Sequence, residues 1–221
     1  MCDDVEVLVF VHGAGRSGAA AWPSVDRPDA LMLDLTESRT VEDQAKVVAS
    51  AVEHSAVVVA HSHGAIPAVL ALPIIGERLR ALVLVEPALY DVARGDPAIE
   101  RHIAVMETAR RAYESHGLRG YWRIVRPLLF GGEFDEACWA SEQGPASQFL
   151  TVQPPWGFGI AAADITGIPT VVVTGGWNDE YEAIAAALVA EGAEHRVLTG
   201  AQHRPQDVPS FGAVLPDALN R

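Results

Sequence analysis

The chain has 221 residues, of which 49% are hydrophobic and 20% are charged, a composition typical of a single globular domain and not of a disordered chain. Its formal net charge of −13 would repel a phosphate backbone and an anionic membrane surface, so we expect neither nucleic acid nor membrane as a partner. The only cysteines, Cys2 and Cys138, are too few for a disulfide framework, and no signal peptide or membrane-spanning run is recognisable, so we expect a cytoplasmic protein.

Six short apolar runs have the composition of buried strands. They cover residues 5–11, 30–35, 56–60, 81–85, 169–174 and 195–198. Helical patterns fall between most of them, over residues 40–53, 65–72 and 180–191. Strands that alternate with helices indicate βαβ units, so the sequence predicts an α/β fold with a mostly parallel sheet and helices on both faces.

The alternation is interrupted between residues of about 88 and 165. This segment contains no good strand, but it contains two expected helices, over 97–116 and 121–129, and then loops with Pro and Trp. A helical insertion after a strand that leads to a site would cover that site as a lid, and the alternative is a packing layer remote from it. We therefore predict one domain over residues 1–221, with 88–165 as a helical cap insertion.

A serine stands at a sharp turn between an expected strand and an expected helix. Ser62 has small residues two positions before and after it, Ala60 and Gly64. In a strained turn that projects the serine above the sheet, these two neighbours would approach each other and must be small. The pattern resembles the nucleophile elbow Gly-x-Ser-x-Gly of the α/β-hydrolase family, with alanine in place of the first glycine.

The first expected strand ends in a glycine-rich turn, His12-Gly13-Ala14-Gly15. This turn is similar to the His-Gly oxyanion loop of the same family. The resemblance implies that the backbone N–H groups of Ala14 and His63 form the oxyanion hole, and that His12 hydrogen-bonds within its own loop. The two strands that usually precede this loop in the family are not recognisable here, which implies a sheet trimmed to about six strands.

The last two strands are followed by candidates for the rest of a catalytic triad. The turn at residues 176–179 is similar to the family's Gly-x-x-Asp turn, and the turn at 200–203 to its Gly-x-x-His turn. The resemblance implies Asp179 as the acid and His203 as the general base. Glu86, which follows the strand at 81–85, is an alternative acid, because some family members carry their acid there. Otherwise its carboxylate would hydrogen-bond loop backbone beside the site.

The two histidines beside Ser62 also admit a metal site. Histidines at this spacing occur in zinc hydrolases, but no further ligand follows them, and side chains at alternate positions of a sharp turn need not converge, so we expect no metal. We expect His61 to bind substrate by lining the acyl pocket, or to pack beneath the turn. Trp156 and Trp177 stand in expected loops and are candidates for lining the substrate site.

Together these residues predict a serine hydrolase that needs no cofactor. Neutral imidazole can accept the Ser62 proton near pH 7, and two N–H donors stabilise the tetrahedral oxyanion. The expected partner is a small-molecule acyl substrate, a neutral or moderately apolar carboxylic ester. The alternatives are a lyase that uses the same triad, or a ligand-binding or interaction module on the same fold. The sequence leaves the oligomeric state open.

Overall fold

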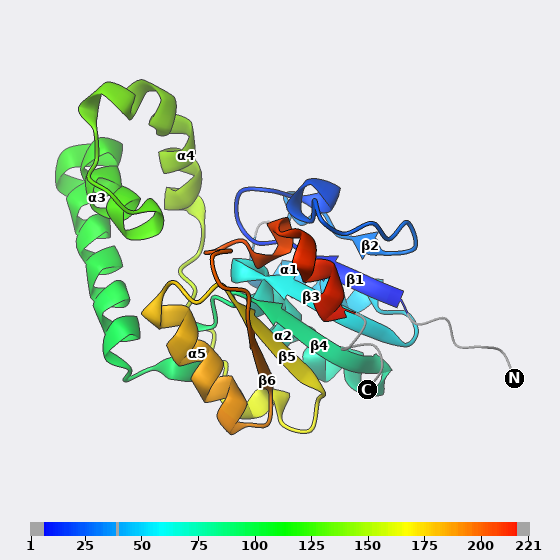
Figure 1. Cartoon of the computed structure of the whole chain (residues 1–221). Helices are drawn as coiled ribbons and strands as arrows, with labels where there is room; N and C mark the ends of the chain where they lie inside the picture. Colours follow the sequence, from blue (N-terminus) through cyan, green and yellow to red (C-terminus); the bar gives the residue numbers. More distant parts are fainter. Residues whose placement is uncertain (1–6, 39, 216–221) are drawn as a thin grey trace, which may run out of the picture. The chain divides into compact units, whose positions relative to one another are not determined.

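A computed structural model describes residues 7–38 and 40–215 of the chain (Figure 1). Within these residues, six parallel strands form one sheet in the order β2-β1-β3-β4-β5-β6. The strands are β1 (Val7–Val11), β2 (Leu31–Met32), β3 (Ala56–His61), β4 (Leu79–Val85), β5 (Thr170–Thr174) and β6 (Glu194–Val197). The α-helices are α1 (Val41–Ala51), α2 (Ala65–Ile75), α3 (Pro97–Phe130), α4 (Trp139–Thr151) and α5 (Asp179–Ala190).

Short 3₁₀ segments connect these elements. They are η1 (Gly18–Ala21), η2 (Ser62–Gly64), η3 (Gly76–Arg78), η4 (Tyr90–Ala93), η5 (Glu136–Cys138), η6 (Ala162–Ile165), η7 (Pro205–Asp207) and η8 (Pro209–Ala213). In the part of the chain that the structure describes, no helix has both the length and the hydropathy needed to cross a membrane.

The strands form where apolar, mostly β-branched residues run together. Every residue of β3 and β5 is buried, as expected for the inner strands of a parallel sheet that is covered on both faces. The edge strand β6 is partly exposed and carries charged side chains, which limits pairing with other chains. The predicted α/β fold with a mostly parallel sheet of about six strands is confirmed. The predicted start of the first strand at Val5 lies outside the described residues.

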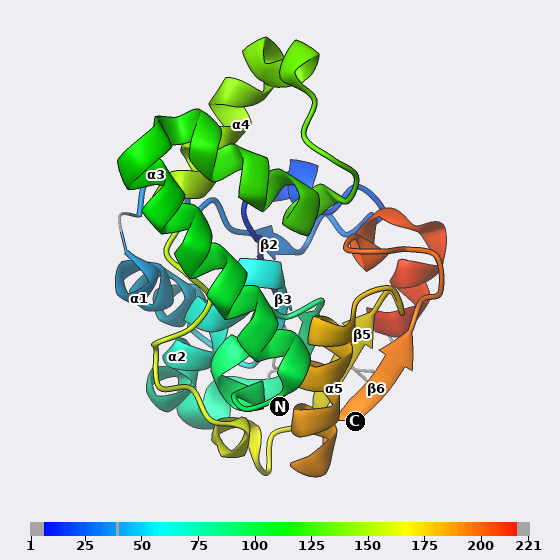
Figure 2. The same cartoon turned by 90° about the vertical axis from the view of Figure 1, so that its left-hand side faces the viewer.

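One face of the sheet packs against Trp22 and Phe211. The strand residues that share one hydrophobic cluster with this pair are Leu8, Phe10, Val57, Val59, Ala81, Val83, Val85, Val171 and Val173. The ring of Trp22 stacks on Phe211 with centroids 6.2 Å apart. Helices α1 and α2 contact each other, and Figure 2 shows them on the side of the strands opposite the segment that carries Phe211. The sheet is therefore covered on both faces.

Helices α1 and α5 each begin with a side-chain cap. The Thr40 hydroxyl accepts the Asp43 N–H at the start of α1. The Asn178 side chain accepts the Glu180 N–H at 2.7 Å, so α5 begins immediately after the turn that follows β5.

The chain divides into two compact units. One contains the sheet and consists of the residues up to Ala93 and those from Pro155 onward, and the other is Arg94–Pro154. Residues 88–93 and 155–165 thus belong to the sheet unit, although we expected them in the insertion. A role of Arg94–Pro154 as a cap stays a prediction.

The unit Arg94–Pro154 consists mainly of α3 and α4. Helix α3 bends at Gly117, where φ is 66°, and this bend separates the two helices that the sequence predicts. Helix α4 was not predicted, because Gly144 and Pro145 interrupt its helical pattern. The buried Trp122 indole N–H donates to Glu142 at 2.6 Å and ties α3 to α4.

The turn between β3 and α2 leaves no room for a side chain at Gly64. A Cβ at this position would lie 2.3 Å from the carbonyl oxygen of His12 and 2.9 Å from that of Val11. Strand β1 pairs with β3 up to Val11 and Ala60, so its end is held against the turn. The small residue is thus required by the end of the neighbouring strand, not by contact with Ala60 as we expected.

Replacement of Gly64 by Ala is expected to lower the free energy of unfolding by about 1–3 kcal/mol, because the backbone atoms that a Cβ would strike cannot rotate aside. Gly212→Ala is the matched control in the same unit, since no atom lies within 4 Å of a Cβ built there. Equilibrium unfolding in urea measures both variants. Equal stabilities of the two variants would contradict this explanation of the turn.

Candidate active site

Ser62 lies directly after β3, at the carboxyl end of the parallel sheet. Its φ of 50° is in the left-handed region, which costs a residue with a side chain about 1–2 kcal/mol. The turn is fastened to the segment after β4, because the Ala88 N–H donates to the Ser62 carbonyl oxygen at 3.0 Å. Such strain persists only where the surrounding structure fixes the backbone, and it is common at functional sites.

His203 lies beside the Ser62 hydroxyl. It follows β6, and its Nε2 is 3.0 Å from Ser62 Oγ. The structure therefore brings together the predicted nucleophile and the predicted base, which are 141 residues apart in the sequence. At this distance the serine hydroxyl can donate its hydrogen to the imidazole, as a base-activated nucleophile requires.

The carboxylate that faces the other side of the His203 ring belongs to Glu86. Its Oε2 is 3.3 Å from His203 Nδ1, and the residue is completely buried. Glu86 follows β4 directly and also has a left-handed φ, of 44°. Its own N–H donates to Val173 of β5 at 2.8 Å, which fixes the backbone from which the carboxylate extends.

The buried Glu86 carboxylate accepts two hydrogen bonds from the turn after β5. The Gly175 N–H donates to Oε1 at 2.6 Å, and the Trp177 indole N–H donates to Oε2 at 3.0 Å. Gly175 cannot carry a side chain, because a Cβ would lie 2.0 Å from the carbonyl oxygen of Gln202, next to His203. The loops after β4, β5 and β6 therefore converge on this one carboxylate.

Asp179, the acid that we predicted first, does not take this position. It is the first residue of α5 and is exposed. Because the Nδ1 side of His203 faces Glu86, the geometry replaces Asp179 with Glu86, the alternative that the sequence left open. The similarity of the turn at 176–179 to the family's acid turn was misleading, since this turn donates the Trp177 indole N–H to Glu86 instead.

His61 is buried beneath the Ser62 turn. It is 3% exposed, and its Nε2 lies 3.0 Å from the carbonyl oxygen of His203. Burial, and then the nearby His203, lower the pKa of His61 well below its ordinary value, so the ring is neutral and Nε2–H donates to that carbonyl. Of the two roles that the sequence leaves open for His61, packing beneath the turn agrees with this placement, in which the side chain holds the His203 loop. Substrate contact by His61 stays a prediction.

The loop at His12–Gly15 is held by the His12 side chain. Its Nε2 accepts a backbone N–H from the segment after β2 at 2.9 Å, so Nδ1–H donates to the Gly13 carbonyl oxygen at 2.7 Å. A Cβ on Gly13 would lie 2.9 Å from the Cβ of Ser62, so this loop touches the elbow. Ala14 is exposed in the loop, and His63 follows Ser62 in η2. Their predicted role as the oxyanion hole stays a prediction.

Aromatic rings surround His203. Tyr181, in the first turn of α5, lies 5.0 Å from its ring, and Trp177 lies 6.2 Å from it. Trp177 is 42% exposed, so it can contact a ligand while its N–H binds Glu86. Trp156 is placed 6.0 Å from the ring of Tyr90. Substrate contact by either tryptophan stays a prediction.

Tyr181 was missed in the sequence. Its position in the first helical turn after β5 is a signal that could have identified it, because residues that follow a strand at the carboxyl edge of a parallel sheet lie near the site.

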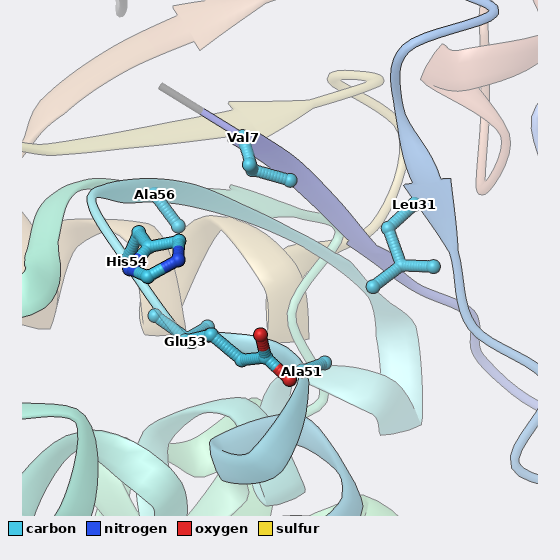
Figure 3. Close-up of a pocket in the computed structure, with 7 residues that line it drawn as sticks. Val7, Leu31, Ala51, Glu53, His54 and Ala56 are labelled. Atoms are coloured by element: carbon cyan, nitrogen blue, oxygen red, sulfur yellow. The ribbon is translucent and has the colours of Figure 1, made fainter. Parts of the chain in front are cut away.

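The pocket in Figure 3 is separate from this cluster, because it lies at the amino ends of β1 and β3, whereas Ser62 lies at the carboxyl end of β3. Its lining residues are Val7, Leu31, Ala51, Val52, Glu53, His54 and Ala56.

Among residues 7–38 and 40–215, no group of three His, Cys, Asp or Glu side chains is arranged to hold a metal ion.

The buried His61 is expected to make stability depend on pH. Its folded-state pKa lies below the ordinary value of 6.5, so its contribution is fully present above about pH 6.5 and is lost as the pH falls, because only the unfolded chain takes up the proton. Gln at this position retains an N–H donor but does not titrate. Between pH 6.5 and 5, urea unfolding of the wild type should lose up to about 1.4 kcal/mol per pH unit relative to His61→Gln. Parallel curves for the two proteins would refute the neutral assignment.

Comparisons with known proteins bear on the family and the fold of this chain. The sequence profile of the alpha/beta hydrolase family matches residues 8–211. No curated protein matches the sequence. A solved bromoperoxidase from Bacillus anthracis is 14% identical with a TM-score of 0.65, and the alignment covers 98% of this chain and 92% of that chain. A hydrolase from Oleispira antarctica is 14% identical with a TM-score of 0.64, covering 98% of this chain and 91% of that one.

The naproxen esterase (carboxylesterase NP) from Bacillus subtilis is also similar, with 14% identity, a TM-score of 0.58, and coverage of 99% of this chain and 85% of that one. At such identities the three structures show that the fold is shared, and they carry no conclusion about activity. The family profile, in contrast, spans nearly the whole chain and includes the segments that carry Ser62, Glu86 and His203. This protein therefore belongs to the alpha/beta hydrolase family.

Proposed function

We propose that this protein hydrolyses small carboxylic esters through a triad of Ser62, His203 and Glu86. The observation that carries the proposal is the 3.0 Å contact between Ser62 Oγ and His203 Nε2, backed by Glu86 at 3.3 Å from Nδ1. A nucleophile, a base and a group that orients the base, in this order of contacts, are the arrangement that acyl transfer needs.

In the first half of the reaction, Ser62 Oγ attacks the ester carbonyl carbon while its proton passes to His203 Nε2. The carbonyl oxygen becomes an oxyanion, which we assign to the backbone N–H groups of Ala14 and His63. The tetrahedral intermediate then collapses, and its bond to the alkoxy oxygen breaks. His203 returns the proton to that oxygen, so an alcohol leaves and the acyl group remains on Ser62.

In the second half, water attacks the acyl carbon and gives its proton to His203. The bond between the acyl carbon and Ser62 Oγ breaks, the proton returns to Oγ, and a carboxylic acid leaves. Glu86 holds the His203 tautomer that carries hydrogen on Nδ1, and its negative charge stabilises the imidazolium formed in both halves. No cofactor enters this sequence of steps.

Charge favours neutral esters as substrates. The chain carries a net charge of −13, and Asp179 and Glu180 begin the helix beside His203. An anionic acyl group would be repelled by this surrounding charge, although less so at high ionic strength. The structural similarity to an enzyme named as a naproxen esterase supports the ester class, and the choice of ester remains part of the proposal.

Ser62→Ala is expected to abolish hydrolysis of a p-nitrophenyl ester, with a loss of at least about 1,000-fold in kcat/KM, because no nucleophile remains. A fluorophosphonate probe should modify Ser62 in the folded wild type and leave the variant unlabelled, as mass spectrometry of the labelled peptide can show. The absence of an adduct on Ser62 in the wild-type protein would refute the proposal. Labelling without hydrolysis of any ester in a panel would instead favour lyase chemistry or ligand binding in the same site.

Glu86→Gln should lower kcat by roughly 100-fold or more, because the amide can donate to Nδ1 and so stabilise the wrong His203 tautomer. Asp179→Asn is the matched control, since it makes the same chemical change on the exposed first residue of α5, and its kcat should stay within about threefold of the wild type. Steady-state kinetics on one p-nitrophenyl ester compares the two. The opposite order of losses would return the acid role to Asp179.

A further inference from the structure

Trp177 donates a hydrogen bond to the acid of the proposed triad. Its indole Nε1 lies 3.0 Å from Glu86 Oε2, the same oxygen that faces His203 Nδ1 at 3.3 Å. Glu86 is completely buried, so its carboxylate depends on donors from the protein. The catalytic steps proposed above give this indole no role, although it binds the oxygen that orients the base.

The two oxygens of the Glu86 carboxylate are held by different donors. The Gly175 N–H donates to Oε1 at 2.6 Å, and the Trp177 indole N–H donates to Oε2. With one donor on each oxygen, the carboxylate cannot turn about its terminal bond without breaking a hydrogen bond. The indole therefore helps to keep Oε2 directed at His203 Nδ1.

The indole also shares the negative charge of Oε2 with His203. A hydrogen bond to a carboxylate stabilises its charged form and weakens its attraction for any other donor. Without the indole N–H, the charge on Oε2 would act on His203 alone and would stabilise the protonated imidazole more strongly. The base would then remain protonated up to a higher pH, and a protonated imidazole cannot accept the Ser62 hydrogen.

The indole is held in place by its neighbours. Its ring lies 6.2 Å from that of His203, at an interplanar angle of 65°, and 6.2 Å from that of Tyr181. The next residue, Asn178, caps α5 with its side chain. Trp177 is nevertheless exposed to solvent, so its replacement should leave the core of the sheet unit intact.

We propose that Trp177 is a positioning residue, whose indole N–H holds the Glu86 carboxylate toward His203 and shares the charge of that carboxylate. The inference rests on the proposed function. Because the indole N–H acts on His203 only through Glu86, its loss should change the pH dependence of catalysis. A role in substrate contact alone would change KM or the rate, and would leave the pH dependence as it is.

Other titratable or charged groups lie near Glu86 and His203 in the described part of the chain. They are His61, Tyr90, Glu180, Tyr181 and Arg204. Burial lowers the pKa of His61 and raises the pKa of Tyr90 and Tyr181, so these three rings stay neutral near pH 7. The substitutions at Trp177 keep all five groups, so a shifted pH dependence would report the Glu86–His203 pair.

Trp177→Phe is the direct test, because it removes the indole N–H and keeps an aromatic ring at this position. For a p-nitrophenyl ester, the midpoint of the acid limb of kcat/KM should move up by about 0.5–1 pH unit, as expected for loss of one hydrogen bond to a charged group. Above that limb, kcat should fall by about 3- to 10-fold, because the carboxylate is held less firmly. The rate of fluorophosphonate labelling of Ser62 should show the same shift in pH.

Trp122→Phe is the matched control, since it removes an indole N–H that donates to Glu142 at 2.6 Å in the unit Arg94–Pro154. Its acid limb should have the wild-type midpoint even if its thermal stability falls. Trp177→Leu lacks both the N–H and the ring, and should shift the midpoint as far as Trp177→Phe does. A shift in the Leu variant alone would assign the effect to the ring and overturn the inference. Circular dichroism and thermal unfolding establish that each variant is folded.

The proposed function and this inference fail in different ways. If Ser62→Ala retains hydrolysis, or if wild-type Ser62 takes up no probe, the proposed function fails and the role of Trp177 falls with it. If the wild type is labelled and active, Ser62→Ala is inactive, and the midpoint for Trp177→Phe stays within about 0.2 pH unit of the wild type, only the inference fails.

Discussion

The buried carboxylate of Glu86 is the constraint on which the geometry of the site depends. A carboxylate without solvent contact is costly unless hydrogen-bond donors surround it. The donors are Gly175 N–H, Trp177 Nε1–H and His203 Nδ1–H, and they come from the loops after β5 and β6. Satisfying one buried charge therefore positions both loops, and through His203 it also positions the hydrogen bond to Ser62. The hydrogen bonds that stabilise the buried Glu86 carboxylate therefore also orient the His203 ring.

Backbone strain is concentrated in the same place. Among residues 7–38 and 40–215, the residues other than glycine with positive φ are Ser62, Glu86 and Gln202. The first two are triad members in our proposal, and the third directly precedes His203. At about 1–2 kcal/mol for each residue, this strain is a substantial fraction of the stability of a typical domain. It is sustained by strand pairing and by tight backbone contacts, such as those at Gly64 and Gly175, which hold the three turns in place.

The sequence predicts those features that depend on local pattern. Apolar runs identify the six strands, and the small residues around Ser62 identify the elbow, because both follow from side-chain size and hydropathy along a short stretch. The carboxylate that reaches His203 cannot be identified in this way, since Glu86 and Asp179 both follow strands and only their three-dimensional placement separates them. The same holds for Tyr181, because its ring contact with His203 depends on how the start of α5 and the loop after β6 are placed in three dimensions. Helix α4 was missed for a local reason, because Gly144 and Pro145 are poor helix formers.

The pairing of β4 with β5 explains why an acid after β4 can serve a histidine that follows β6. Val85 and Val173 are partners across these strands, so Glu86 emerges beside the start of the next turn, at Gly175. A side chain that extends from β4 toward β6 must cross the end of β5, and the absence of a side chain at Gly175 leaves that path open while its N–H binds the carboxylate on the way. Glutamate, with one methylene more than aspartate, is suited to the longer reach. The turn after β5, which resembles a turn that carries an acid, is thereby free to begin α5 at Asp179 and to place the ring of Tyr181 5.0 Å from that of His203.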